Sequence, residues 1–398
     1  MMTSEDRNES IGLMEPLLIS ESSRHRGVLN DLALELATRS AAFKSSLPKE
    51  IVSALAELVR SMNCYYSNLI EGHETHPIDI ERALLEDYSA DPGKRDLQLE
   101  AKAHIAVQSW IDAGGVAGAE TDPASLCEIH RRFCVLLPDT LLWVENPETK
   151  ERARVIPGAY RTGDVKIGRH IPVSPGAIPR FLDRFHDAYG RPGKASAIIG
   201  AAGAHHRFLW IHPFADGNGR VARLMSHAML LRSLDTGGLW SVARGLARKV
   251  ETYKEHLASC DTDRRNDLDG RGTLSEEALA SFTRFFLETC LDQVTFMESL
   301  MQPAALRERV LLWTKNEAEV GRLPAKAGRL MEAVLYRGSL PRSELENTLG
   351  MADRSARRVA AALVKAGVLT SETHKSDLRL AFPASLASLW MPGLFPEK

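Results

Sequence analysis

Ile211-His212-Pro213-Phe214-Ala215-Asp216-Gly217-Asn218-Gly219-Arg220-Val221-Ala222-Arg223 is the stretch from which the rest of this sequence is best interpreted. Gly217 and Gly219 can adopt positive φ, and Asn218 between them tolerates left-handed geometry better than most residues, so a tight turn is expected here. Residues 220–231 are good helix formers with a mostly apolar face. The sequence therefore predicts a turn that opens a helix.

The start of this helix has the groups that bind an anion. Unpaired backbone N–H groups at a helix start point outward together and, with the helix dipole, favour negative charge. Arg220 and Arg223 are three residues apart, so both can bind one phosphate chain. Asp216 is placed to hold Mg²⁺, which prefers carboxylate oxygen. His212, mostly neutral at cellular pH, is the expected acceptor of a proton from an incoming hydroxyl.

The stretch resembles the signature of the Fic (Fido) family, His-x-Phe-x-Asp/Glu-Gly-Asn-Gly-Arg-x-x-Arg, at every fixed position. The resemblance implies a protein adenylyltransferase that transfers AMP from ATP to a Ser, Thr or Tyr hydroxyl of a target protein. It implies that His212 is the general base, that Phe214 anchors the loop and that Asp216 binds the metal. The nucleotide-binding positions that it implies, with ATP and Mg²⁺ as cofactors, are Phe214, Gly217, Asn218, Gly219, Arg220 and Arg223.

A second motif ends a predicted amphipathic helix over residues 50–72, where Ser67 and Glu71 fall opposite the apolar stripe. By themselves these residues indicate a solvated face with a glycine cap at Gly72. However, Ser67-Asn68-Leu69-Ile70-Glu71-Gly72 resembles the inhibitory Ser/Thr-x-x-x-Glu-Gly/Asn pattern upstream of the catalytic motif in many Fic proteins. The resemblance implies autoinhibition through Ser67, Glu71 and Gly72, because a carboxylate on Arg223 would neutralise the charge that should hold the γ-phosphate.

Residues 157–172 have glycines at intervals and a Val-Lys-Ile alternation, which indicate a short hairpin, with an irregular connecting loop as the alternative. In Fic proteins a hairpin at this place, the flap, covers the nucleotide site and pairs its edge with the target polypeptide. The resemblance therefore implies that Val165, Lys166 and Ile167 dock the target.

Two metal sites are rejected. His205 and His206 precede His212, but no carboxylate or third ligand falls at zinc-site spacing. Residues 263–276 contain half of a calcium-loop pattern, but Arg265 stands at the first ligand position. A capped loop that enters a helix is expected there instead.

The composition changes near residue 300. Residues 301–398 contain 15 Lys+Arg and 10 Asp+Glu, a balance of +5, whereas the whole chain has −2. A helix, a glycine turn, a second helix and a two-strand segment resemble a winged helix. Four basic residues, Arg354, Arg357, Arg358 and Lys365, lie on or beside the second helix, where they could meet DNA phosphates. Winged helices also serve as protein–protein modules, so both kinds of partner stay open.

The composition of the 398 residues, 44% hydrophobic and 26% charged, is typical of a soluble globular protein. The small net charge gives no general attraction to nucleic acid or to acidic membranes. No apolar run has the length of a membrane span, and no secretory signal is expected. Five scattered cysteines without Cys-x-x-Cys spacing favour reduced thiols in the cytoplasm.

We therefore expect an all-α fold: a Fic-type helical bundle with a short β-hairpin flap, plus a small C-terminal winged-helix domain. The expected domains are a flexible N-terminal arm over 1–27, an N-terminal helical region with the inhibitory helix over 28–120, a Fic catalytic domain over 121–299 and a winged-helix-like domain over 300–398.

Three other functions stay open. The same site could remove AMP, with Glu71 orienting a water, or it could use another nucleotide such as UTP. From a different class, the chain could be a DNA-binding regulator whose Fic domain senses nucleotide. The expected partners are a target protein with an acceptor hydroxyl, the chain itself as a substrate or in a homodimer, and no membrane.

Overall fold

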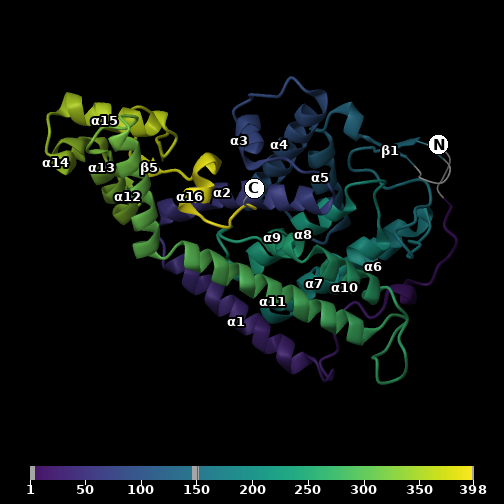
Figure 1. The fold of residues 1–398 in the computed structure, drawn as a ribbon. Helices are drawn as coiled ribbons and strands as arrows, with labels where there is room; N and C mark the ends of the chain where they lie inside the picture. Colours follow the sequence, from purple (N-terminus) through teal and green to yellow (C-terminus); the bar gives the residue numbers. More distant parts are fainter. Residues whose placement is uncertain (1–4, 146–149, 151, 397–398) are drawn as a thin grey trace. The chain divides into compact units, whose positions relative to one another are not determined.

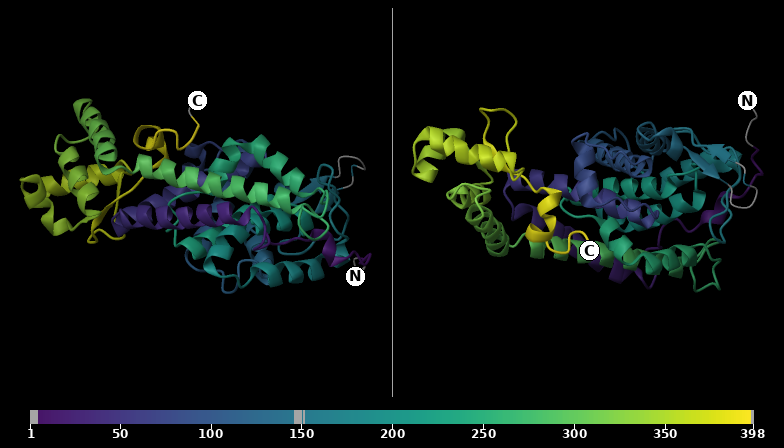
Figure 2. Two further views of the ribbon diagram at one scale, coloured as in Figure 1. Left: turned by 90° about the horizontal axis from the view of Figure 1, so that it is seen from below. Right: turned by 45° about the horizontal axis from the view of Figure 1, so that its top comes forward.

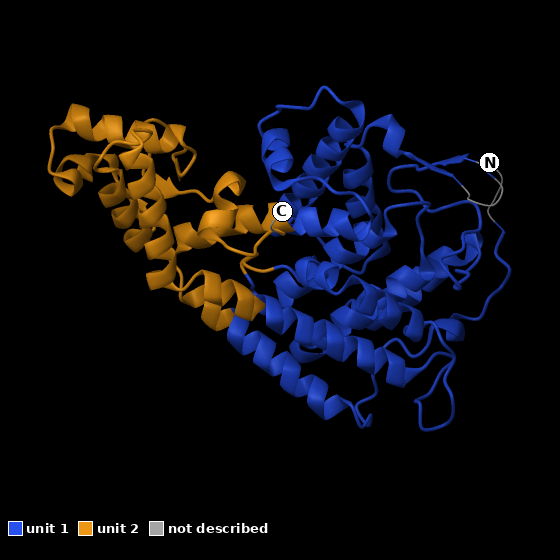
Figure 3. Ribbon diagram, in the orientation of Figure 1, with its two compact units in different colours: residues 1–40, 63–236, 241–293 blue, residues 41–62, 237–240, 294–398 orange. Residues whose placement is uncertain are grey.

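The computed structural model describes residues 5–145, 150 and 152–396. They form two compact units, which Figure 3 distinguishes by colour: unit 1 contains residues 1–40, 63–236 and 241–293, and unit 2 contains residues 41–62, 237–240 and 294–398. The described residues are mostly helical, with one two-stranded and one three-stranded sheet, which confirms the predicted helical class. No helix among the described residues is both long and apolar enough to cross a membrane.

Unit 1 holds most of the helices (Figure 1). Its α-helices, three of which continue into unit 2, are α1 (Arg26–Ser45), α2 (Lys49–Ile70), α3 (Pro77–Leu84), α4 (Pro92–Asp112), α5 (Pro123–Cys134), α6 (Ile178–Tyr189), α7 (Lys194–Ile211), α8 (Asn218–Leu234), α9 (Val242–Arg248), α10 (Val250–Cys260) and α11 (Glu276–Leu300). Its short elements are η1 (Ile11–Met14), η2 (Asp139–Leu141), η3 (Pro175–Ala177) and the antiparallel strands β1 (Trp143–Glu145) and β2 (Arg152–Arg154).

Helices α7 and α8 pack against each other at the centre of unit 1, in the teal part of the ribbon (Figures 1 and 2). Nearly every side chain of α8 is buried, whichever side of the helix it occupies. Helix α7 is rich in Ala and Gly, which allows close packing: a Cβ at Gly203 would lie 2.9 Å from the Tyr189 hydroxyl. The segment that connects these two helices is the motif turn, so two buried helices support it.

The helices around this centre begin where the sequence places caps. Asp122 accepts a hydrogen bond from the Ala124 N–H at 2.8 Å, and Pro123 fills the first turn of α5. Asp91 and Pro92 start α4 in the same way, with the Lys94 N–H as donor at 2.8 Å. These caps fix the starts of the two helices that flank the motif turn.

The prediction of a flexible arm over residues 1–27 is wrong for its described part. Met14, Leu17 and Ile19 are buried, and Arg180 of α6 donates to both carboxylate oxygens of Asp6 at 2.9 Å. Arg207 of α7 donates to the Pro16 carbonyl at 2.9 Å. Side chains of α6 and α7 bond to polar groups of this segment. The segment is therefore held in place although its sequence has no helical periodicity.

Unit 2 is built on a small three-stranded sheet. Its elements are α12 (Pro303–Glu319), α13 (Ala327–Arg337), β3 (Ser339–Leu340), η4 (Arg342–Glu344), α14 (Leu345–Leu349), α15 (Asp353–Lys365), β4 (Leu369–Thr370), β5 (Leu378–Leu380), η5 (Ala384–Leu386) and α16 (Ala387–Trp390). The strand order is β3-β5-β4, and both pairs are antiparallel. The two predicted strands are present. Strand β3 is a third strand, which was not predicted because a run of two residues is too short to give a strand pattern.

Candidate functional site

His212 is placed by the end of helix α7. It adopts the left-handed conformation, with φ 51° and ψ 61°, and its N–H donates to the Phe208 carbonyl at 3.0 Å. Its Nδ1 lies 3.2 Å from the Leu209 carbonyl oxygen, which can only accept, so Nδ1 carries the proton. The Nε2 lone pair is thereby left to accept a proton, as the prediction for His212 requires.

The motif turn is held by a buried core of its own. The Phe214 ring is fully buried and stacks on His130, with ring centroids 3.9 Å apart. The Asn218 side chain accepts from the Phe214 N–H at 3.0 Å and donates to the Phe214 carbonyl at 2.8 Å. His130 Nε2 lies 3.2 Å from the Asp216 carbonyl oxygen. Phe214 is therefore a loop anchor rather than a nucleotide contact, and Asn218 has only its backbone to offer a phosphate.

Gly217 begins helix α8. Its φ of 79° is in the left-handed region, and a Cβ there would also lie 3.4 Å from the His130 ring. The helix then starts at Asn218, and the N–H groups of its first turn have no acceptor within the helix. The predicted turn and helix are both confirmed, and the helix start has the form of an anion site.

Arg223 is bound by both residues of the upstream motif. Its Nε donates to the Ser67 hydroxyl at 2.8 Å, and its Nη2 donates to the Glu71 carboxylate at 2.5 Å. A Cβ at Gly219 would lie only 2.3 Å from Glu71 Oε1, so the carboxylate occupies the space over the start of α8. The structure thus brings Ser67, Glu71 and Arg223 together as the resemblance implies.

Glu71 lies in a turn that follows α2, which we call the 71–73 turn. The His73 N–H donates to the Asn68 carbonyl at 2.9 Å and the Gly72 N–H to the Leu69 carbonyl at 3.0 Å. This is the Schellman pattern, and Gly72 supplies its left-handed residue with φ 84°. The Glu71 side chain is 31% exposed, so it lies at the edge of the site.

Arg220 is bound by different partners, which the sequence did not reveal. Its Nη2 donates to Glu100 Oε1 and lies 3.1 Å from His73 Nδ1. Glu100 Oε2 lies 2.7 Å from the same His73 nitrogen. The guanidinium also lies over the Phe133 ring, 5.5 Å from its centroid. Glu100 is in the middle of a helical pattern 120 residues before Arg220, and no local signal connects the two.

Two cavities border the motif turn. The first, the His212 cavity, has a volume of about 280 Å³ and is lined by His212, Gly219, Arg223, Glu71, Ile167 and Tyr253, among others. The second, the Asp216 cavity, has about 170 Å³ and is lined by Asp216, Gly217, Arg220, Glu100 and His73 beside apolar residues. The predicted base and the predicted metal ligand therefore face separate cavities, with the start of α8 between them.

Burial and charge set the protonation states of the site. Burial lowers the pKa of His212 to about 4, so the ring is neutral at neutral pH. Burial would raise the pKa of Glu71, but the charges of Arg223 and Arg220 outweigh it and the pKa is lowered. The hydrogen bond that His73 donates to Glu100 raises the pKa of His73. A neutral imidazole and an ionised carboxylate thus line the same cavity.

The side chains present suit Mg²⁺ better than a transition metal. Asp216 is exposed at the turn and is the only carboxylate that the motif offers. Among the described residues, no three His, Cys, Asp or Glu side chains form a metal-binding group. His205 bonds Ser226 and Tyr253 instead, as expected for a core histidine. One carboxylate is sufficient for Mg²⁺, which takes its other ligands from phosphates and water.

The predicted hairpin over residues 157–172 is reduced to one antiparallel bridge. Ile167 and His170 exchange backbone hydrogen bonds of 2.9 and 3.0 Å, and no strand is assigned to this segment. Side-chain hydrogen bonds of Arg161 take the place of backbone hydrogen bonds between strands. Arg161 donates to the His212 carbonyl at 2.8 Å and to the Gly163 carbonyl at 2.9 Å. Side-chain bonds therefore hold this loop, and Ile167 is the one predicted docking residue that lines the His212 cavity.

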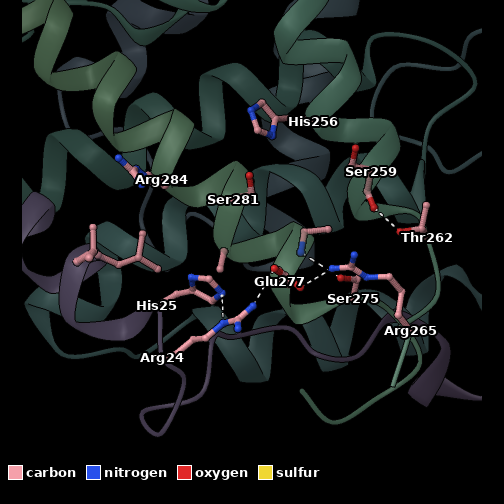
Figure 4. A pocket seen from close by; sticks show the side chains of 14 residues that line it. Arg24, His25, His256, Ser259, Thr262, Arg265, Ser275, Glu277, Ser281 and Arg284 are labelled. Atoms are coloured by element: carbon pink, nitrogen blue, oxygen red, sulfur yellow. Dashed lines mark hydrogen bonds and ion pairs between the residues drawn. The ribbon is translucent and has the colours of Figure 1, made fainter. Parts of the chain in front are cut away.

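A further cavity in unit 1, of about 580 Å³, contains none of the motif residues. Figure 4 shows Glu277 between Arg24 and Arg265, which it binds as ion pairs. Both arginine side chains are 69% exposed, so this is a surface ion-pair network and not part of the site at His212.

Known proteins resemble the same region. The family model described as Fic/DOC family matches residues 120–230. The protein adenylyltransferases Fic of Nematostella vectensis and Drosophila willistoni are each 31% identical to 42% of this chain. The matched parts make up 37% and 31% of those relatives, so the chain spans about a third of their length.

Solved structures extend the likeness to the fold. A Fic family protein from Desulfovibrio desulfuricans G20 has a TM-score of 0.54 at 16% identity and covers 92% of this chain and 98% of its own. Fic-1 (residues 134–508) from C. elegans has a TM-score of 0.52 at 19% identity and covers 70% of this chain and 74% of its own.

The architecture around α7 and α8 is the helical Fic fold, with a histidine, two arginines and a helix start gathered at one turn. Residues 120–230, which contain that turn, match the family model. This part of the chain is therefore similar to the Fic/DOC family.

Proposed function

We propose that this chain is a protein adenylyltransferase that transfers AMP from ATP to a Ser, Thr or Tyr hydroxyl of a target protein. The observation that carries the proposal is that His212, Arg223 and the start of α8 line one cavity. A helix start with two arginines binds a polyphosphate, and a neutral imidazole beside it accepts a proton. The names of the curated relatives support the same activity.

The reaction follows from these positions. The acceptor oxygen attacks the α-phosphorus of ATP, its proton passes to His212 Nε2, and the bond from the α-phosphorus to the bridging oxygen breaks to release pyrophosphate. The low pKa of His212 keeps the ring neutral and ready to accept. Arg220 and Arg223 would hold the β- and γ-phosphates. Asp216 would hold Mg²⁺, which neutralises phosphate charge when bound.

Glu71 inhibits the enzyme in this proposal. Its carboxylate accepts from Arg223 at 2.5 Å and covers Gly219, where a γ-phosphate oxygen would need to bind. ATP could then bind only in a pose that does not align the α-phosphorus with His212. Ser67 contributes by accepting a hydrogen bond from Arg223, and Gly72 contributes the left-handed residue that shapes the 71–73 turn.

The test compares wild type, Glu71→Gly and Glu71→Gln, incubated with Mg²⁺ and ATP labelled on the α-phosphate. Both variants should increase the label on protein by about tenfold to a hundredfold. The reason is that the γ-phosphate of ATP no longer competes with the Glu71 carboxylate for Arg223. Label from UTP would instead indicate another donor. If neither variant retains label, and wild type but neither variant removes AMP from a modified protein, removal is the activity.

Target docking by the segment Val165–Ile167 is part of the proposal. Docking by edge addition would use the backbone of this segment, in which Ile167 is paired with His170. Ile167 would contribute its side chain, which lines the His212 cavity.

A second candidate function concerns residues 300–398, which we propose to be winged-helix-like. The order helix α13, β3, α14, α15, β4 and β5 supports this. Helix α15 buries Ala356, Val359 and Leu363 and exposes Arg354, Arg357, Arg358 and Lys365. Such a face could bind DNA phosphates, with the chain acting as a nucleotide-sensing regulator. Duplex binding that does not weaken steeply with added salt would exclude this candidate.

A further inference from the structure

The two arginines of the motif are not held alike. Arg223 uses its Nε and Nη2 on Ser67 and Glu71, which lie at the end of α2 and in the 71–73 turn. Arg220 is 4% exposed and is paired with Glu100, whose side chain is 2% exposed in the interior of α4. One arginine is thus bound by an edge carboxylate and the other by an internal one.

Arg220 has a donor that no protein group satisfies. Its Nε is buried and has no hydrogen-bond partner among the described residues. Buried donors are rarely left unpaired in native proteins, and those that are often mark a ligand site. Because Arg220 also lines the Asp216 cavity, a phosphate oxygen placed there could accept from it.

His73 completes the arrangement around Glu100. The carboxylate accepts from both Arg220 and His73, whose Nδ1 must carry a proton to donate to it. With Phe133 on the face of the guanidinium, Arg220 is restrained by both a carboxylate and an aromatic ring. A guanidinium that is restrained in this way has lost its rotational freedom before any ligand binds.

We propose that Glu100 is a positioning residue that holds the Arg220 guanidinium in its phosphate-binding orientation. The inference rests on the proposed function, since it assigns a role in the binding of the ATP phosphates. It gives Glu100 the opposite effect to Glu71, although both are carboxylates paired with arginines of α8. The reason is that Glu100 is buried in the middle of a capped helix, so we expect the ion pair to persist when nucleotide binds.

The experiment measures the Kd for Mg·ATP by calorimetry in the Glu71→Gly background. Adding Glu100→Gln keeps the size of the side chain and removes its charge, and the Kd should rise about tenfold. Glu100→Asp should restore part of the affinity. The matched control is Asp112→Asn on the same helix, whose carboxylate pairs with His227 at 2.7 Å and should leave the Kd unchanged.

A double-mutant cycle separates positioning from general stability. If Glu100 acts through Arg220, then Glu100→Gln should change the Kd little once Arg220 is replaced by Ala. Fully additive effects, or an affinity that is unchanged or improved in Glu100→Gln, would overturn the proposal. Should Glu71→Gly bind Mg·ATP and transfer no AMP, the proposed function fails while this cycle still decides the role of Glu100. Absence of any Mg·ATP binding would overturn both.

Discussion

The 71–73 turn and the middle of helix α4 each present a carboxylate to an arginine of α8, and they differ in how firmly they hold it. Glu71 is 31% exposed and is followed by a left-handed glycine, whereas Glu100 is 2% exposed inside a helix of 21 residues. A turn at the surface can open at a small cost in free energy, whereas a buried helix opens only with its unit. The same ion pair can therefore block a ligand in one place and prepare its site in the other.

The largest expected effect tests whether the AMP transfer that follows removal of the Glu71 carboxylate depends on His212. In the Glu71→Gly background, His212→Ala should lower the rate of AMP transfer by roughly 10²- to 10⁴-fold, because the proton acceptor is lost. The affinity for Mg·ATP should change little. His374→Ala, an exposed histidine of unit 2, is the control and should keep the rate. A rate that survives His212→Ala would mean that the 71–73 turn controls something other than this base.

A smaller effect sharpens the contrast between the two carboxylate-bearing elements. Gly72→Ala puts a Cβ on a residue with φ 84° and should destabilise the 71–73 turn by about 1–2 kcal/mol, which would raise labelling several-fold. Gly114→Ala adds the same strain at φ 78°, just after α4, with nothing within 4 Å of the new Cβ. Equal activation by both variants, measured as labelling per folded protein, would show that general loosening and not the 71–73 turn is responsible.

The smallest expected effect is the pH dependence of Glu71→Gly. Because burial lowers the pKa of His212 to about 4, its neutral form persists above pH 5 and is lost only as the pH falls through that value. The rate constant kcat/KM should therefore stay flat between pH 8 and pH 6. An unshifted imidazole would lose about three-quarters of its neutral form by pH 6. Adding His73→Gln removes the other imidazole near Arg220 and should leave the profile flat.

The parts of the site that the sequence predicted correctly are local. Two glycines and a helix pattern define the motif turn within a dozen residues, and Ser67 and Glu71 lie within five residues of each other. Such features depend on backbone preferences that neighbouring residues set. The contact of Glu71 with Arg223, which joins distant segments, was predicted from the family resemblance and not from spacing.

The features that the sequence did not predict depend on distant partners. The role of Glu100 and His73 is visible only in the folded structure, where α4 and the 71–73 turn both lie against Arg220. The segment before α1 has polar residues that looked solvated, yet Asp6 is paired with Arg180 of α6. Residues 157–172 have the composition of a hairpin, but they form only one antiparallel bridge. Hydrogen bonds of the Arg161 side chain hold the rest of the loop. Long-range pairing of this kind leaves no periodic signal.

The central claim is that the triphosphate of ATP binds where Glu71 now lies, against the start of α8. A crystal structure of the Glu71→Gly, His212→Ala double variant with Mg·ATP tests it most directly, since the variant should bind ATP without consuming it. The account predicts γ-phosphate oxygens within hydrogen-bond distance of Arg223, with the α-phosphorus facing position 212. A triphosphate bound elsewhere, with the start of α8 uncovered, would contradict it.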